Sequence, residues 1–397
     1  MLLLTPLHLL GYSAAPPPNT MTKVLLSDAP ARHGARCLDG SPPAYYVRPA
    51  SAPQNASRIV VYFQGGGWCY TLDDCRSRSK GGLGSSKSYP DAQGDLGGVI
   101  SGDASLNPDF ATWNAIWVPY CDGGSYSGSL DSPSVPDGLW FRGRANMRAV
   151  VTDLLEARGM ASATHVLIDG GSAGGLTTLL HADFFRGLLP EGVRFGAIGD
   201  AGWFRPDASM DRNNYTGAIR GMAAMMNATS NAGCEAAHAD DPAACMFAPT
   251  IFPYLQSDMM VVEGAYDSWQ LLNILGLKCS YYGKDLSGCS AAENATIDAY
   301  GDAMRASILV ALGSTAHHRR SAGCFVSACI THVETADNEN HDEWDLKAAG
   351  RTPRDVAREW FFGAQGEATS ASRQLIEPCA HYPCNPDPRC HGFTRRR

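Results

Sequence analysis

The chain has 397 residues, of which 44% are hydrophobic and 18% are charged. This composition can bury a large core and argues against global disorder, and because catalytic α/β folds often run long, we expect one domain with insertions. The formal net charge of −8 provides no long-range attraction to nucleic acid or to an anionic membrane. We therefore expect a compact enzyme or binding protein without a nucleic-acid partner.

Several features are typical of secreted proteins. The chain has thirteen cysteines, and Asn-x-Ser/Thr sequons begin at Asn55, Asn214, Asn227 and Asn294. Residues 1–20 open with a short apolar stretch that leads to small residues, which resembles a signal peptide although it lacks a basic start. A disordered tail is the alternative for these residues. No other segment has the ~18 uninterrupted apolar residues of a membrane helix, so we expect no stable membrane insertion.

The first predicted elements are two strands and a helix. Residues 58–63 form a β-branched and aromatic run that stops at Gly65-Gly66-Gly67, and residues 114–120 have the same character. From 142 to 158, apolar residues recur at helical spacing until Gly159 supplies a stop. This pattern predicts a helix that packs on a sheet.

A second strand-to-helix unit follows directly. Residues 164–169 predict a strand, which runs into a glycine turn and a helix over 176–185, and later strands are predicted at 259–264 and 323–329. Strands that alternate with helices imply a mostly parallel central sheet with helices on both faces. Residues 205–255 are rich in Asn, Ala, Met and Pro and predict a cap-like surface insertion in a single domain that covers 21–397.

The glycine turn Gly170-Gly171-Ser172-Ala173-Gly174 matches the pattern G-x-S-x-G. A serine hydroxyl is a weak nucleophile, so it needs a base beside it and donors for the oxyanion formed on a carbonyl. In this pattern the glycines permit a strained turn that presents the serine above the sheet, and the following helix N-terminus adds positive potential. A structural serine is the alternative, but the flanking strand and helix favour Ser172 as the nucleophile of an α/β-hydrolase.

The N–H donors of the oxyanion hole are expected to come from two segments. In this class one N–H comes from the residue after the serine, here Ala173, and another comes from a glycine-rich loop after an earlier strand. The loop at residues 65–68 follows a predicted strand upstream of Ser172. A merely flexible turn is the alternative.

The acid and the base should follow the serine at later strand ends. Asp267 and His332 satisfy that chain order. Residue type alone leaves two competitors open, Asp200 as the acid and His341 as the base.

Several longer motifs resemble the pectin acetylesterase family, and the resemblance covers about residues 35 to 392. The motifs are Gly65-Gly66-Gly67-Trp68-Cys69, Tyr120-Cys121-Asp122-Gly123-Gly124-Ser125, Gly171-Ser172-Ala173-Gly174-Gly175, Ala265-Tyr266-Asp267-Ser268-Trp269-Gln270, Cys37-Leu38-Asp39-Gly40-Ser41-Pro42-Pro43-Ala44-Tyr45 and Tyr382-Pro383-Cys384-Asn385-Pro386. The resemblance implies a catalytic triad and a set of oxyanion donors, which are Ser172, Asp267 and His332 with Gly66, Gly67 and Ala173. It implies no metal and no organic cofactor.

The chain departs from the family pattern at three positions. The family histidine follows Ser-Cys-x-x-His, and here Ala328 replaces the serine, while Cys329 and His332 match and favour His332 over His341. Plant members usually carry a cysteine at the position of Val333, so we expect one family disulfide to be missing or rerouted. They also commonly carry a cysteine at the position of Gly171, just before the serine.

An odd number of cysteines leaves at least one without an intramolecular partner. The expected pairs are Cys69 with Cys75, Cys234 with Cys245, Cys279 with Cys289, and Cys37 with Cys121. Zinc is an alternative by ligand type at Cys379, Cys384, Cys390 and His391, but their spacing matches no standard zinc module.

The resemblance implies that a secreted, monomeric esterase removes acetyl groups from pectin in the cell wall. One alternative is a Notum-like esterase that removes a fatty acyl group from a protein, which requires a deep apolar pocket. Another is a catalytically silent glycan-binding homologue. Cationic side chains would assist binding of polyanionic pectin, and the candidates, each with a solvated surface role as the alternative, are Arg142, Arg144, Arg148 and Arg205.

Overall fold

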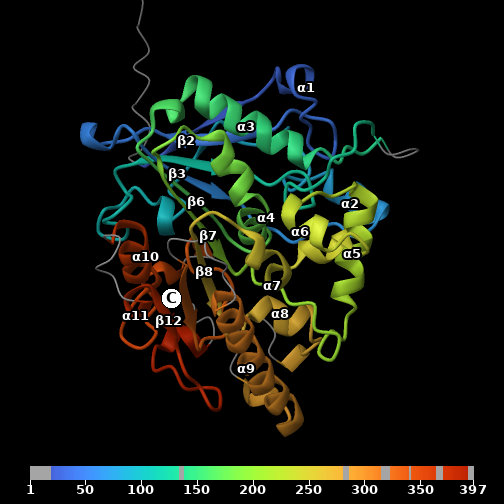
Figure 1. Cartoon of the computed structure of the whole chain (residues 1–397), viewed down its shortest axis with the longest axis vertical. Coiled ribbons are helices and arrows are strands. Elements are labelled where there is room, and N and C mark those ends of the chain that lie inside the picture. The colour runs from blue at the N-terminus through green and yellow to red at the C-terminus, as the bar shows by residue number, and fades with distance from the viewer. Residues whose placement is uncertain are drawn as a thin grey trace, which may run out of the picture.

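The protein is built on one ten-stranded sheet, shown with its helices in Figure 1. The computed structural model describes residues 19–133, 138–279, 286–313, 322–338, 341–363 and 370–391. The segment predicted as a signal peptide therefore lies almost entirely outside the described residues. The strand order is β12-β9-β8-β7-β6-β3-β5-β2-β1-β4.

Most of the sheet is parallel, as the sequence predicts. The parallel strands are β3 (Arg58–Phe63), β5 (Asn114–Val118), β6 (His165–Gly170), β7 (Arg194–Asp200), β8 (Met259–Gly264), β9 (Gly323–Ser327) and β12 (Gln374–Ile376). The antiparallel edge is β2 (Ala44–Arg48), β1 (Met21–Leu25) and β4 (Ala92–Gln93). A separate two-stranded sheet joins β10 (Asp337–Asn338) to β11 (His341–Asp342).

Helices cover both faces of the sheet. They are α1 (Ala29–Arg32), α2 (Leu72–Arg78), α3 (Gly143–Ala157), α4 (Ala173–Leu188), α5 (Tyr215–Met226), α6 (Ala232–Ala237), α7 (Ala248–Ile251), α8 (Ser268–Asn273), α9 (Ala291–Gly313), α10 (Pro353–Phe362) and α11 (Ser370–Arg373). The segment predicted as a cap holds α5, α6 and α7 between β7 and β8, and α5 and α6 lie together at the right of Figure 1.

Side-chain alternation along the strands creates two apolar cores. In β8, Met259 and Val261 join one core with α3 and α4, while Met260 and Val262 join the other with α10. All six residues of β8 are buried, which is the expected burial of a parallel strand covered on both faces. The long apolar runs in the sequence therefore reflect a sheet with no solvated face at its centre.

Six disulfides include every pair predicted from the sequence. They are Cys37–Cys121, Cys69–Cys75, Cys234–Cys245, Cys279–Cys289, Cys329–Cys390 and Cys379–Cys384. The unpaired thiol is that of the buried Cys324. The cysteines considered as zinc ligands are thus bonded to other cysteines, and the described residues contain no group of His, Cys, Asp and Glu that could hold a metal ion.

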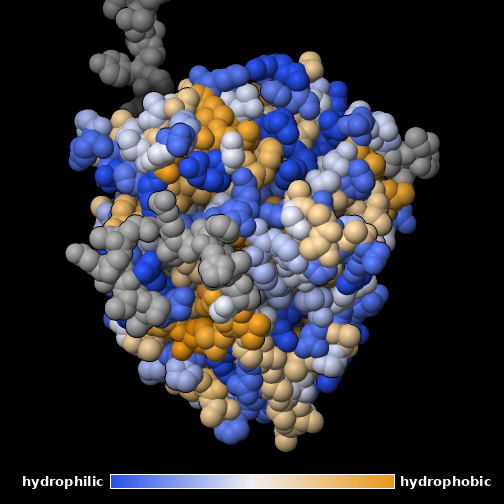
Figure 2. Space-filling view, in the orientation of Figure 1, coloured by the Kyte–Doolittle hydropathy of each residue, from blue (hydrophilic) through white to orange (hydrophobic). Residues whose placement is uncertain are grey.

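In the described part of the chain, no helix is long and apolar enough to cross a bilayer. Figure 2 shows one face, on which hydrophilic residues predominate and hydrophobic areas are scattered among them.

Candidate active site

Ser172 lies in the turn between β6 and α4. Its backbone has φ 60° and ψ −122°, an uncommon conformation for a residue with a side chain, and its N–H donates to the carbonyl of Asp200 at 2.9 Å. The residue is 6% exposed, and α4 begins immediately after it. This strained turn between strand and helix is the arrangement that presents a nucleophilic serine in α/β-hydrolases.

His332 and Asp267 form a hydrogen-bonded pair. His332 Nδ1 lies 2.7 Å from Asp267 Oδ2, and Asp267 Oδ1 accepts the N–H of Gln270 at 2.7 Å in the first turn of α8. Asp267 is fully buried, and the ring of Trp269 stacks on His332 with centroids 6.2 Å apart. The carboxylate can therefore fix the orientation of the imidazole.

The competing residues have other positions. Asp200 Oδ2 accepts the N–H of Glu334 at 2.7 Å, the N–H of Thr335 at 2.6 Å and the Thr335 hydroxyl at 2.8 Å. Asp200 therefore holds the loop that follows His332, and burial raises its pKa to about 6. His341 begins β11, and its side chain lies outside the described residues.

The glycine loop after β3 lies directly against the serine turn. A Cβ atom on Gly65 would lie 2.4 Å from the carbonyl oxygen of Gly171 and 2.9 Å from Ser172 Cβ, so only glycine permits this approach. Gly67 has φ 63°, in the left-handed region. Gly66 and Gly67 line the same cavity as Ser172, and Ala173 is the buried first residue of α4.

A cavity of about 410 Å³ brings these groups together. Its lining includes Ser172 and His332 and otherwise consists mainly of glycines and apolar or aromatic side chains, which are Tyr62, Gln64, Gly65, Gly66, Gly67, Leu96, Ile100, Trp117, Gly171, Trp269, Val333 and Ala336. Among the described residues, His332 is the only ionisable group of this lining other than the Tyr62 phenol. The cavity can therefore accept an uncharged ester.

The arginines proposed to assist a polyanion lie elsewhere. Arg142 donates to the carbonyls of Gly34 and Leu130, and the other three contact groups away from the cavity: Arg144 contacts His181, Arg148 lies over Phe184, and Arg205 pairs with Asp207. None of these arginines lines the cavity. They sit on α3 and on the segment after β7, and chain position alone could not show which way those elements face.

A second buried acid lies behind Asp267. Glu263 at the end of β8 is fully buried, and its Oε2 accepts the N–H of Trp203 at 3.0 Å. Burial, together with the negative charge of Asp267, raises the pKa of Glu263 well above its usual value. The environment of Glu263 therefore favours its neutral, protonated form beside the Asp267 carboxylate. Sequence reasoning missed it because it ends an apolar strand.

Gly171 and Val333, two positions at which the chain departs from the family pattern, lie next to each other. A Cβ atom on Gly171 would lie 2.7 Å from Val333 Cγ1, so the two positions at which plant members carry cysteine face each other beside the nucleophile. Val333 has φ 72°, an unusual value for a β-branched residue. Here an apolar contact takes the place that a disulfide could occupy.

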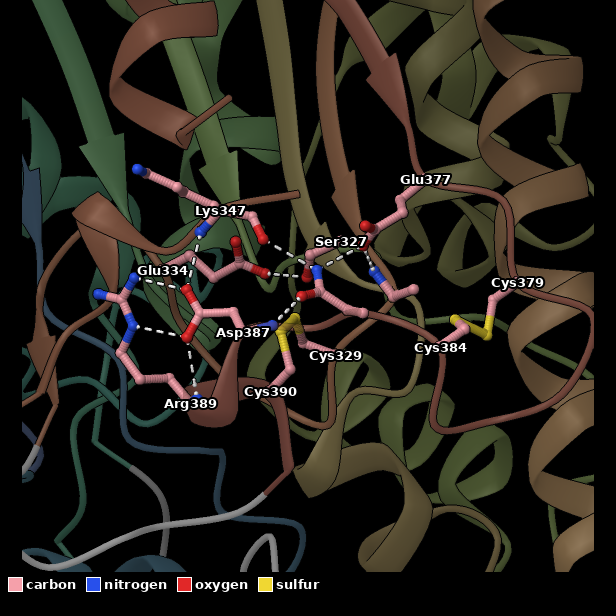
Figure 3. Close-up of a disulfide and its surroundings, with 12 residues drawn as sticks. Ser327, Cys329, Glu334, Lys347, Glu377, Cys379, Cys384, Asp387, Arg389 and Cys390 are labelled. Carbon is pink, nitrogen blue, oxygen red and sulfur yellow. Dashed lines mark hydrogen bonds and ion pairs between the residues drawn. A yellow bond between two sulfur atoms is a disulfide. The ribbon is translucent and has the colours of Figure 1, made fainter. Parts of the chain in front are cut away.

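The C-terminal segment braces the loop that carries His332 (Figure 3). Cys329 is bonded to Cys390, and the carbonyl of Cys390 accepts the N–H of Ile330 at 3.2 Å. Glu377 Oε2 accepts the N–H of Ala328 at 2.8 Å, and Ser327 donates to Glu334 at 2.8 Å. The loop is thus fixed on both sides of His332.

The mostly parallel sheet with helices on both faces and a serine turn between β6 and α4 define an α/β-hydrolase-like fold. A family model described as pectinacetylesterase matches residues 15–391, and the chain therefore belongs to the pectin acetylesterase family. It is a carboxylic ester hydrolase.

Curated relatives come from plants and animals. Pectin acetylesterases 11 and 7 of Arabidopsis thaliana are 32% identical over 368 residues and 31% identical over 363 residues, and each alignment covers 89% of both chains. The palmitoleoyl-protein carboxylesterase NOTUM of Schmidtea mediterranea is 26% identical over 260 residues, or 62% of this chain and 49% of that protein. Among solved structures, the Wnt deacylase Notum from Drosophila has the same fold, with a TM-score of 0.73, 22% identity, and coverage of 91% of this chain and 97% of that one.

Proposed function

We propose that the protein is a secreted, monomeric serine esterase that removes acetyl groups from pectin in the cell wall. The observation that carries this proposal is the 2.7 Å pair of His332 and Asp267 in the same cavity as Ser172. A serine, a histidine and a buried carboxylate in this arrangement supply the nucleophile, the base and its orienting group of an acyl transfer. The six disulfides support an extracellular location.

The mechanism follows from the roles of these groups. His332 accepts the proton of Ser172 as the serine oxygen attacks the ester carbonyl, and the backbone N–H groups of Gly66, Gly67 and Ala173 stabilise the oxyanion. The protonated imidazole then gives its proton to the sugar oxygen as the C–O bond of the tetrahedral intermediate breaks, so the sugar leaves as an alcohol and an acetyl-enzyme remains. Water, deprotonated by His332, releases acetate. Asp267 keeps the imidazole oriented and stabilises its charged form.

The acyl group is supported by the plant relatives, which are pectin acetylesterases by name. A second function, removal of a longer acyl chain from a protein, is favoured by one observation. The cavity is larger than an acetyl group, and Leu96, Ile100 and Val333 give it apolar walls. Rates on p-nitrophenyl acetate, butyrate and octanoate separate the two, because the acetylesterase proposal requires the highest kcat/KM on acetate.

The central test is acetate release from p-nitrophenyl acetate and from acetylated pectin by wild type and by Ser172→Ala. We expect the variant to lose at least about a thousandfold in kcat on both substrates. Ser51→Ala, which changes an exposed serine, is the matched control and should retain full activity. Activity that survives in Ser172→Ala, or a wild type that binds pectin without releasing acetate, would contradict the proposal.

A further inference from the structure

Arg78, the last residue of α2, reaches back to the glycine loop beside Ser172. Its Nη2 donates to the carbonyl of Gly66 at 2.7 Å and to the carbonyl of Trp68 at 3.2 Å. The helix that carries Arg78 is itself tied to this loop, because Cys75 in α2 is bonded to Cys69. The guanidinium and the disulfide therefore hold the same short segment of backbone.

The bond to Gly66 fixes the direction of a particular N–H group. The Gly66 carbonyl and the Gly67 N–H belong to one peptide unit, which is trans, so the two groups point in opposite directions. With the carbonyl directed at Arg78, the Gly67 N–H points away from it. In the described part of the chain the N–H groups of Gly66 and Gly67 have no acceptor, although both residues line the cavity with Ser172. They remain available to a ligand.

The charge of Arg78 acts on the same peptide unit. Within the described residues no carboxylate lies at ion-pair distance from Arg78, and its Nη1 is buried without a hydrogen-bond partner. The guanidinium lies over the ring of Tyr120, 5.7 Å from its centroid, and its charge acts on the buried Asp122 without an ion-pair contact. A guanidinium at the carbonyl end of a peptide draws electron density toward the oxygen, which makes the N–H at the other end a stronger donor.

We propose that Arg78 is a positioning residue of the oxyanion hole, which orients and polarises the Gly66–Gly67 peptide so that the Gly67 N–H meets the developing oxyanion. This inference rests on the proposed esterase function. Arg78 would thus stabilise the transition state from the end of a surface helix, without contacting the substrate itself. A donor that is oriented before the reaction stabilises the oxyanion at no reorganisation cost.

The test compares Arg78→Gln and Arg78→Lys with Arg76→Gln, a control on the same helix. kcat and KM are measured with p-nitrophenyl acetate, which has no carboxylate for an arginine to bind, and thermal midpoints are measured in parallel. We expect Arg78→Gln to lower kcat by roughly tenfold to a hundredfold with KM changed by less than about twofold, and Arg78→Lys to recover part of the loss. The affinity of a phenylboronic acid, which mimics the tetrahedral intermediate at Ser172, should fall in parallel with kcat.

Each other outcome overturns the inference. Unchanged kcat in Arg78→Gln removes the positioning role, and a rise in KM on acetylated pectin alone would show instead that Arg78 binds substrate carboxylates. An equal loss in Arg78→Gln and Arg78→Lys, together with a lowered thermal midpoint, would show a purely structural role. Failure of the proposed function is distinguishable, because it appears as activity retained in Ser172→Ala with Arg78 intact.

Discussion

The two oxygens of the Asp267 carboxylate have separate roles. One accepts from His332 Nδ1, and the other accepts the N–H of Gln270 in the first turn of α8, where the helix dipole favours a negative charge. The carboxylate is therefore held in one orientation by the backbone before it orients the imidazole. These two contacts stabilise the buried carboxylate.

The choice between the two histidines gives the first prediction. His332→Ala should lower kcat on p-nitrophenyl acetate by at least about a thousandfold, because the serine loses its base, whereas His341→Ala should keep it within about threefold. Steady-state kinetics on both variants measures this. A severe loss in His341→Ala with a mild one in His332→Ala would reverse the assignment.

The second prediction concerns the proton on Glu263. Its pKa in the folded state is raised by burial and by Asp267. At pH values between the ordinary pKa of a glutamate and this raised pKa, the native state holds a proton that the unfolded state has released. The stability that this group contributes is thus present at low pH and is lost as the pH rises. In Glu263→Gln, which has a similar shape and retains an acceptor for the Trp203 N–H, we expect near-normal activity at pH 7.

Urea unfolding at a series of pH values measures the effect on stability. The free energy of unfolding should fall less steeply with rising pH in Glu263→Gln than in wild type. An unchanged slope would show that Glu263 does not hold this proton.

At the scale of elements, the site depends on segments far from Ser172 in sequence. The loop with His332 is joined to the chain terminus by Cys329–Cys390, and the glycine loop is joined to α2 by Cys69–Cys75. Both disulfides connect a catalytic loop to a neighbouring segment, so they restrict its alternative conformations as well as those of the unfolded chain.

Loss of the Cys329–Cys390 disulfide gives the third prediction. The double variant Cys329→Ser/Cys390→Ser should lower both the thermal midpoint and kcat, because the disulfide begins three residues before His332. The matched control is Cys379→Ser/Cys384→Ser, which removes a disulfide of the same C-terminal segment (Figure 3) and should lower stability with little change in kcat. Equal effects of the two pairs on kcat would contradict a specific brace on the histidine loop.

The sequence predicted the elements whose signal is local. β3, β6 and β8 are continuous apolar runs buried on both faces, and each was predicted with its bounds to within a residue. The short edge strands were missed, since β4 has two residues and β12 has three and neither contains a periodic pattern. α9 was missed because many of its own residues are alanines, which obscure an apolar stripe along the helix.

The same division applies to the candidate site. The serine turn and the glycine loop have local motifs, and chain order indicated Asp267 and His332. Arg78 and Glu263 could not be predicted, because their significance lies in contacts with the Gly66 carbonyl and with Asp267 that no spacing in the sequence reveals.

At the scale of the whole molecule, the fourth prediction concerns how many cysteine thiols are free. Cys324 is buried in β9, and burial raises the pKa of its thiol to about 12, so its reactive thiolate form is scarce. Native protein should therefore not react with Ellman's reagent, and protein unfolded in guanidinium without reductant should release one equivalent of thiol per chain. More than one equivalent would mean that a disulfide is not formed.

In the proposed mechanism, Ser172 is the residue that carries the acyl group. The most direct measurement is mass spectrometry of peptides from enzyme quenched in acid during turnover of p-nitrophenyl acetate. We predict one added acetyl group on the peptide that contains Ser172. An acetyl group on another residue, or acetate release with no acyl-enzyme and full activity in Ser172→Ala, would contradict the account.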